Sequence, residues 1–180
     1  MPENKNVKFS VLNLVPKFQN DTDIDAINRA TELIKIVEKL GYHRYWVAEH
    51  HNFRGVLSSA TALIIQHLLA NSEKIRVGAG GVMLPNHTAL QVSETYGTLE
   101  TLYPGRVDLG IGRAPGTDSD TAALIYRTQY VRTSKFVEAI KDIQRFMGSE
   151  EEQGIVSAYP GINTNVPIFM LGSSIHSASV

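Results

Sequence analysis

Short apolar runs alternate with longer segments that carry apolar residues at helical spacing along the 180-residue chain. The short runs predict β-strands over residues 7–14, 45–48, 75–83, 107–111 and 166–171. The longer segments predict helices over residues 21–40, 58–69, 87–103 and 130–147. Gly41 directly follows the first helical segment and is a typical helix-ending residue. The predicted order of elements is therefore β-α-β-α-β-α-β-α-β.

This alternation predicts an α/β protein whose parallel sheet packs against helices. Such a sheet belongs to a doubly wound fold or to a (β/α)8 barrel, and both folds bind ligands at the carboxyl ends of the strands. Polar, basic or glycine-rich residues lie at or just past every predicted strand end. They are Asn13, Glu49-His50-His51, Gly80-Gly81, Gly112-Arg113 and Gly172-Ser173-Ser174. Their shared location predicts that they belong to one pocket.

Composition argues against several classes of function. The net charge of −1 indicates no basic surface for nucleic acid or an anionic membrane. The absence of cysteine excludes disulfides, thiolate metal sites and cysteine nucleophiles. The amino-terminal residues are polar, and no apolar run approaches the roughly 20 residues of a membrane span. We therefore expect a cytoplasmic protein with a single domain over residues 1–180.

Arg113 lies in the sequence GIGRAPG, directly after the fourth predicted strand. An arginine in that place can bind a phosphate through charge-assisted hydrogen bonds. Position alone does not decide between this role and an ion pair with Asp108, Asp118 or Asp120. The segment matches the dinucleotide-binding pattern GxGxxG only weakly, because its third glycine comes one residue late and Pro115 would disturb the start of a helix.

Two further strand ends have both a structural and a ligand-binding interpretation. Gly80 and Gly81 lie inside a predicted strand, where glycine lowers stability. They indicate either a bulge or tight packing, or else the close approach of a flat ligand to the backbone. Ser173 and Ser174 follow the last predicted strand and indicate either a helix N-cap or a site for a phosphate or an oxyanion.

Glu49, His50 and His51 follow the second predicted strand in the sequence YWVAEHHN. Zinc sites of the HExxH type place two histidines on one face of a helix, whereas adjacent histidines on an extended segment point to opposite sides. No third ligand lies nearby in the sequence, so we expect no metal site. One histidine that acts as an acid, a base or a hydrogen-bond donor fits this position better.

Four blocks of the sequence together resemble the bacterial luciferase-like monooxygenases. The blocks are LGYHRYWVAEHHN, IRVGAGGVMLPNHTALQVSE, YPGRVDLGIGRAPG and VPIFMLGSSIHSA, and they follow the order of that family from about residue 40 onward. The resemblance implies a TIM-type (β/α)8 barrel that binds reduced FMN, or the deazaflavin F420 in a sister branch, at the carboxyl ends of the strands. The blocks are more similar to the flavin branch.

The resemblance also implies roles for individual residues. His50 matches an active-site histidine close to the reactive face of the flavin, and Gly80-Gly81 matches a pair that can form a non-prolyl cis peptide under the flavin ring. Arg113 matches an arginine that binds the flavin phosphate, and Ser173-Ser174 matches the phosphate-binding loop. The implied reaction is the oxidation of a small organic substrate with O2, with a flavin reductase as a partner.

The chain is shorter than the roughly 200–250 residues of a minimal barrel. We therefore expect the amino-terminal part of a (β/α)8 barrel, truncated after about five strands. An open sheet of this kind exposes an edge and an apolar inner face, which predicts a homo-oligomer. Two functions remain open: a monooxygenase that is active once the missing half is supplied, and a non-catalytic or vestigial flavin-binding protein. An F420-dependent oxidoreductase is a further alternative.

Overall fold

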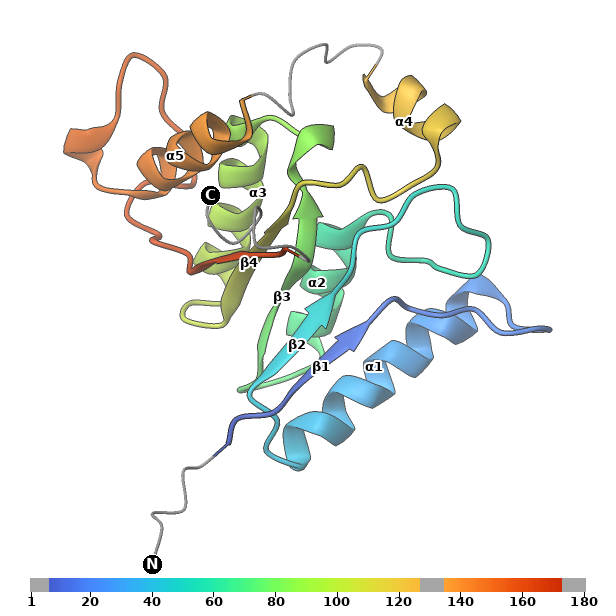
Figure 1. The fold of residues 1–180 in the computed structure, drawn as a ribbon. Helices are drawn as coiled ribbons and strands as arrows, with labels where there is room; N and C mark the ends of the chain where they lie inside the picture. Colours follow the sequence, from blue (N-terminus) through green and yellow to red (C-terminus); the bar gives the residue numbers. More distant parts are fainter. Residues whose placement is uncertain (1–6, 127–134, 173–180) are drawn as a thin grey trace, which may run out of the picture.

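The computed structural model of the chain describes residues 7–126 and 135–172. Within these residues five strands form one sheet in the order β1-β2-β3-β4-β5, and each pairs with the next in parallel (Figure 1). The strands are β1 (Ser10–Asn13), β2 (Arg44–Val47), β3 (Arg76–Met83), β4 (Val107–Gly112) and β5 (Ile168–Met170). The helices are α1 (Asp23–Lys39), α2 (Thr61–Ala70), α3 (Ala89–Leu102), α4 (Ser119–Tyr126) and α5 (Phe136–Met147), with 3-10 helices at Leu84–Asn86 and Glu150–Glu152. The predicted α/β fold with a parallel sheet is confirmed.

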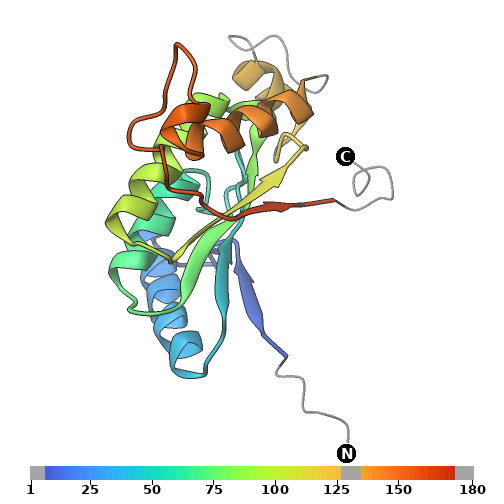
Figure 2. The same ribbon diagram turned by 90° about the vertical axis from the view of Figure 1, so that its left-hand side faces the viewer.

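The helices α1, α2 and α3 form a layer on one side of the sheet (Figure 2). The hydrophobic core lies between this layer and the strands, and its fully buried members include Ile34, Tyr45, Val47, Ile65, Leu68, Val77, Leu109 and Ile111. Side chains alternate between the two faces of a strand, so the residues between these positions point to the other side. We call that side the open face; it carries Leu12, Arg44, Trp46, Asp108, Phe169 and Leu171.

Helix α1 shows how local sequence sets the element boundaries. Thr22 is its N-cap and forms a capping box with Asp25, which satisfies free backbone N–H groups of the first turn. The helix ends before Gly41, whose φ of 77° lies in the left-handed region that glycine adopts without strain. The predicted stop at Gly41 is therefore confirmed.

Other boundaries differ from the predictions. Strand β1 begins at Ser10, and α2 begins at Thr61 with Ala60 as an N-cap that makes no side-chain hydrogen bond. The serines expected to cap α2 lie before it, and the Thr61 hydroxyl donates to the carbonyl of Ser58 instead. Helix α4 was not predicted, because its eight residues are too few to display a helical period. Helix α5 begins at Phe136, and residues 130–134 of the predicted helix lie outside the described residues.

Candidate functional site

The amino-terminal end of the open face is charged. Asp108 on β4 is fully buried, and both of its oxygens accept hydrogen bonds from arginines of β2 and β3. Arg44 Nε lies 2.9 Å from Asp108 Oδ2, and Arg76 Nη2 lies 2.6 Å from Asp108 Oδ1. Gly78 lies beside Asp108 in the register and leaves room for it, since a Cβ at residue 78 would collide with the Asp108 backbone. Asp108, a candidate partner for Arg113 in the sequence, thus has Arg44 and Arg76 as partners.

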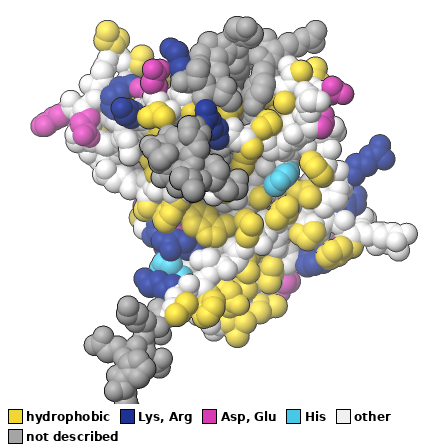
Figure 3. All heavy atoms as spheres, viewed as in Figure 1, with side chains coloured by type: hydrophobic (Ala, Val, Ile, Leu, Met, Phe, Trp, Pro, Cys, Tyr) yellow, Lys and Arg dark blue, Asp and Glu magenta, His cyan; other side chains and the backbone are white. Residues whose placement is uncertain are grey.

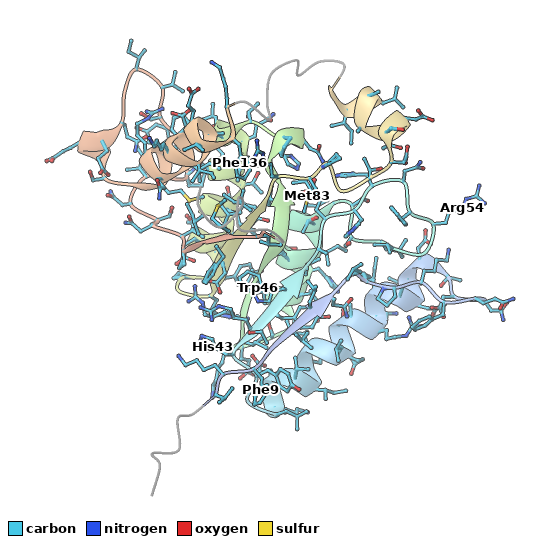
Figure 4. The ribbon with its side chains drawn as sticks, in the orientation of Figure 1. Phe9, His43, Trp46, Arg54, Met83 and Phe136 are labelled. Atoms are coloured by element: carbon cyan, nitrogen blue, oxygen red, sulfur yellow. The ribbon has the colours of Figure 1, made fainter. Side chains whose placement is uncertain are left out.

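An apolar layer lies next to this charged end. The Trp46 ring meets the Phe169 ring edge to face, with the centroids 5.2 Å apart. Leu12 and Leu171 lie beside them and are 58% and 38% exposed. Hydrophobic side chains gather across the middle of this side of the molecule in Figure 3, and Figure 4 shows where Trp46 lies among the strands. The open face therefore offers an apolar surface to a ligand or to another protein segment.

Gly80 and Gly81 interrupt the register between β3 and β4, and the peptide bond between them is cis. A Cβ at Gly80 would lie 2.8 Å from Trp46 Cβ, and one at Gly81 would lie 2.8 Å from the carbonyl oxygen of Gly110. Both distances are shorter than real side chains tolerate. The bulge and the tight packing therefore account for both glycines without a ligand. Gly80 is still half-buried, so its backbone remains within reach from the open face.

His50 and His51 have different surroundings. The His50 ring meets the Phe53 ring edge to face, with the centroids 5.9 Å apart. Its Nδ1 atom is buried and makes no hydrogen bond within the described residues. His51 Nε2, by contrast, lies 2.9 Å from Glu49 Oε1. The structure thus separates the two histidines, as expected for adjacent residues on an extended segment.

Glu49 is the centre of a buried polar network and is only 2% exposed. Its carboxylate lies 2.9 Å from His87 Nε2 and accepts hydrogen bonds from the backbone N–H of Met83 at 3.1 Å and from Asn86 Nδ2 at 3.2 Å. A cavity of about 190 Å³ between the starts of α2 and α3 has Glu49 and His87 in its wall. Glu49 therefore faces the helix layer.

The network keeps Glu49 ionised. Burial alone would favour the neutral acid, but hydrogen bonds from His51 and His87 outweigh it and lower the pKa of Glu49 to about 2. The hydrogen bond to Glu49 in turn raises the pKa of His51. Because an ionised carboxylate only accepts hydrogen bonds, both histidines must carry a hydrogen on Nε2.

The loop after β4 is held against the segment after β2. Arg113 begins this loop; its side chain is exposed, and its guanidinium carbon lies 5.9 Å from the centroid of the Phe136 ring. The hydrogen bonds between the segments join His51 N to Gly116 O, Thr117 Oγ1 to His51 O, Asn52 Nδ2 to Asp118 Oδ2 and Asn86 Nδ2 to Pro115 O. We call the segments 49–52, 83–87 and 113–118, at the ends of β2, β3 and β4, the rim.

The rim brings together most of the residues singled out in the sequence. His50 and Arg113 lie on it, and Gly80-Gly81 lies just below it on β3. Ser173 and Ser174 lie outside the described residues. Within residues 7–126 and 135–172, no group of three or more His, Cys, Asp or Glu side chains could hold a metal ion. In the same ranges, no helix is long and apolar enough to cross a membrane.

Sequence reasoning missed Asn86 and His87 as members of this site. They lie in the sequence LPNH directly after β3, and periodicity placed His87 at the start of a helix. Their position after a strand end was the available signal, because the other polar groups of the rim also follow strand ends. The pairing with Glu49 spans 37 and 38 residues, so no local pattern records it.

Comparison with known sequences identifies relatives over nearly the whole chain. A protein of Bacillus subtilis (strain 168) named YddN is 52% identical over 176 residues, and a luciferase-like monooxygenase of Escherichia coli (strain K12) is 40% identical over 176 residues. Each match covers 98% of this chain and 52% of the relative. The chain therefore spans about half the length of these relatives.

Solved structures share the fold. Apo-MsnO8 superposes with a TM-score of 0.87 at 30% identity, over 96% of this chain and 51% of that one. The oxygenating constituent of 3,6-diketocamphane monooxygenase from Pseudomonas putida, in complex with FMN, gives 0.71 at 14% identity over 93% and 51%. An F420-dependent secondary alcohol dehydrogenase gives 0.66 at 17% identity over 95% and 54%. The last two show the fold alone.

These structures agree with the expected five-strand part of a (β/α) barrel, because the matched region makes up about half of each solved chain. The sequence model of the luciferase-like monooxygenases matches residues 7–179, almost the full length of the chain. With that match and with relatives of 52% and 40% identity, the chain belongs to the luciferase-like monooxygenase family.

Proposed function

We propose that the chain supplies the cofactor-binding half of a monooxygenase that uses reduced FMN and O2 to oxidise a small organic substrate. The observation that carries the proposal is the open face itself. The half-buried backbone of Gly80, in a cis peptide with the buried Gly81, lies beside the apolar Trp46, directly below a rim that carries His50 and Arg113. Flavin, O2 and substrate would meet at this end of the sheet, where barrel enzymes carry their sites.

The residues of the open face fit a flavin. An isoalloxazine ring is flat and largely apolar, and it needs a surface from which no side chain projects. The half-buried backbone of Gly80 provides such a place, bordered by the apolar atoms of Leu12 and Trp46, whereas Gly81 and Gly110 are buried with Leu171 Cδ1 close to both. The buried and unbonded Nδ1 of His50 supplies a polar atom nearby on the rim.

Arg113 suits the phosphate of FMN. Its side chain is exposed at the end of β4, and a guanidinium matches the geometry of a phosphate through paired hydrogen bonds. A phosphate bound there would gain charge-assisted hydrogen bonds, which are stronger than neutral ones. Ser173-Ser174 follows the neighbouring strand β5 in the sequence, and we assign it to the same phosphate as part of the proposal.

The chain would perform two tasks in the reaction: it would exclude water and handle a proton. Bound reduced flavin supplies the two electrons with which one atom of O2 enters the substrate and the other leaves as water. Trp46, Leu12 and Phe169 exclude water from the reacting atoms, which protects reactive species from hydrolysis. His50 would hold or move a proton through Nδ1, as histidine does in general acid–base catalysis. A flavin reductase would regenerate the reduced cofactor.

FMN is favoured over F420 because the sequence blocks resemble the flavin branch. Both cofactors occur among proteins of this fold, since one solved relative is an FMN complex and another is F420-dependent. Direct titration separates the two. The absence of binding by either cofactor would support instead a vestigial protein without a redox function.

Fluorescence titration with FMN, riboflavin and F420 tests the proposal. We expect saturable quenching by FMN in the micromolar range, weaker binding of riboflavin, which lacks the phosphate, and no binding of F420. Arg113→Ala should lower the affinity for FMN about tenfold, the loss typical of a charge-assisted hydrogen bond, and leave riboflavin unaffected. Arg54→Ala is the matched control, because Arg54 is exposed and extends away from the sheet (Figure 4). Failure of FMN to show saturable quenching would refute the proposal.

A further inference from the structure

We propose that Glu49 is a positioning residue whose buried carboxylate joins the three segments of the rim and thereby sets the places of His50 and Arg113. The inference rests on the proposed function, because it concerns the same flavin site. Glu49 itself faces the helix layer, beside the cavity between α2 and α3, and does not reach the open face. It would therefore act on the cofactor only through other residues.

The first step is the set of donors around the carboxylate. His51 belongs to the segment after β2, the Met83 backbone ends β3, and His87 lies in the loop that leads to α3. Each donates to the same two oxygen atoms over distances of 2.9–3.1 Å. A single side chain thus connects the ends of two neighbouring strands, and it is adjacent in sequence to His50.

The second step extends the network to the loop that carries Arg113. Asn86 Nδ2 donates to Glu49 Oε1 at 3.2 Å and to the carbonyl of Pro115 at 2.9 Å. The His51 backbone N–H donates to the carbonyl of Gly116 at 3.1 Å. Pro115 and Gly116 follow Arg113 by two and three residues, so the position of that arginine depends on this contact.

The third step is that the site requires a carboxylate. Every group directed at Glu49 is a hydrogen-bond donor, and a carboxylate accepts at both oxygens. Glutamine has the same size but replaces one acceptor oxygen with an NH2 group. That group is itself a donor and would face the N–H donors of the surrounding residues, so neither could form a hydrogen bond. A buried donor that loses its acceptor carries the full cost of its desolvation. Glu49→Gln should therefore release the network without creating a cavity.

The chain offers a matched control in Glu38. Its carboxylate also accepts backbone hydrogen bonds, from the N–H groups of Glu73, Lys74 and Ile75 at 2.6–3.0 Å. These residues precede β3, at the opposite end of the sheet from the rim. Glu38→Gln should thus loosen a comparable contact that has no connection with the flavin site.

Residue-resolved amide exchange of the full chain, combined with flavin titration, tests the inference. In Glu49→Gln we expect the Met83 and His51 amides to exchange at least about tenfold faster, because their acceptors are lost or displaced. We also expect the ratio of FMN affinity to riboflavin affinity to fall toward one, because Arg113 is no longer held. A purely structural role for Glu49 would leave that ratio unchanged. Glu38→Gln should accelerate exchange only before β3.

Unchanged exchange at Met83 and His51, or an unchanged affinity ratio, would overturn the inference. Asn86→Ala provides a second variant if Glu49→Gln does not fold, and it should change both quantities in the same direction by a smaller amount. Failure of the wild-type chain to bind FMN would refute the proposed function instead. The exchange measurement would then still decide whether Glu49 joins the rim segments.

Discussion

Asp108→Asn removes the carboxylate that Arg44 and Arg76 share on the open face. Three hydrogen bonds from charged groups end on this carboxylate, at 2.9 Å from Arg44 Nε, 2.8 Å from Arg76 Nε and 2.6 Å from Arg76 Nη2. The Asp108 side chain is 1% exposed, so its negative charge has no comparable contact with water. Asparagine keeps the shape but leaves two guanidinium groups without their counter-charge.

The magnitude follows from the burial of the three groups. Loss of one partner of a buried ion pair typically costs about 3–5 kcal/mol. The side chains of Arg44 and Arg76 are 24% and 21% exposed, so water recovers part of their solvation in the variant. We therefore expect a loss of about 3 kcal/mol in the free energy of unfolding, near the lower end of that range.

Urea denaturation followed by Trp46 emission measures this loss, because the indole lies on the same face as Asp108. With a slope of about 2 kcal/mol/M, the midpoint should fall by about 1.5 M. Glu32→Gln is the control; it removes an exposed ion pair with Lys35 on α1 and should cost less than about 0.5 kcal/mol. A midpoint for Asp108→Asn within about 0.3 M of the wild-type value would refute the reasoning.

Three further predictions follow from the rim and the sheet. The pKa of Glu49 falls from 4.5 to about 2 on folding. Ionised Glu49 therefore contributes about 3 kcal/mol to the free energy of unfolding above pH 4.5, and this contribution is lost as the pH falls toward 2. An acid-unfolding profile of Glu49→Gln as steep as the wild-type profile would contradict this. Gly81→Ala should cost about 1–3 kcal/mol by thermal unfolding because its Cβ would meet Gly110, whereas Gly55→Ala, with only one atom at 3.9 Å, should be nearly neutral. The open face and the sheet edges at β1 and β5 should cause self-association, and light scattering that shows a monodisperse monomer would exclude it.

The sequence predicted the strands and most helices because a repeating burial pattern is a local property. Strand β4 is an example: Val107, Leu109 and Ile111 alternate with other residue types in its sequence, and these three side chains belong to the hydrophobic core. Helix α4 has too few residues to show a period, and the N-cap of α2 is an alanine that carries no capping signal. The local signal for α4 was its cap, since the Thr121 backbone N–H donates to Asp118 Oδ1 directly before the helix.

The candidate site was only partly accessible from the sequence. The position of residues after strand ends indicated that Glu49, His50 and Arg113 would gather at one edge, and the structure places the rim there. Apart from His51, the partners of Glu49 lie 34–38 residues away, so their pairing with the carboxylate depends on the register of β2 and β3. The tight packing of Gly80 against Trp46 likewise arises between strands and could not be distinguished from a ligand site by sequence.

Titration of Trp46 emission with FMN tests most directly whether the open face is the flavin site. Trp46 is the only tryptophan of the chain and borders Gly80 on that face, so its emission reports on this location. We predict a saturable loss of emission at one FMN per chain, with a midpoint in the micromolar range that moves to higher concentration in Arg113→Ala. A loss of emission that never saturates, and that is the same in the wild-type chain and in Arg113→Ala, would contradict the account.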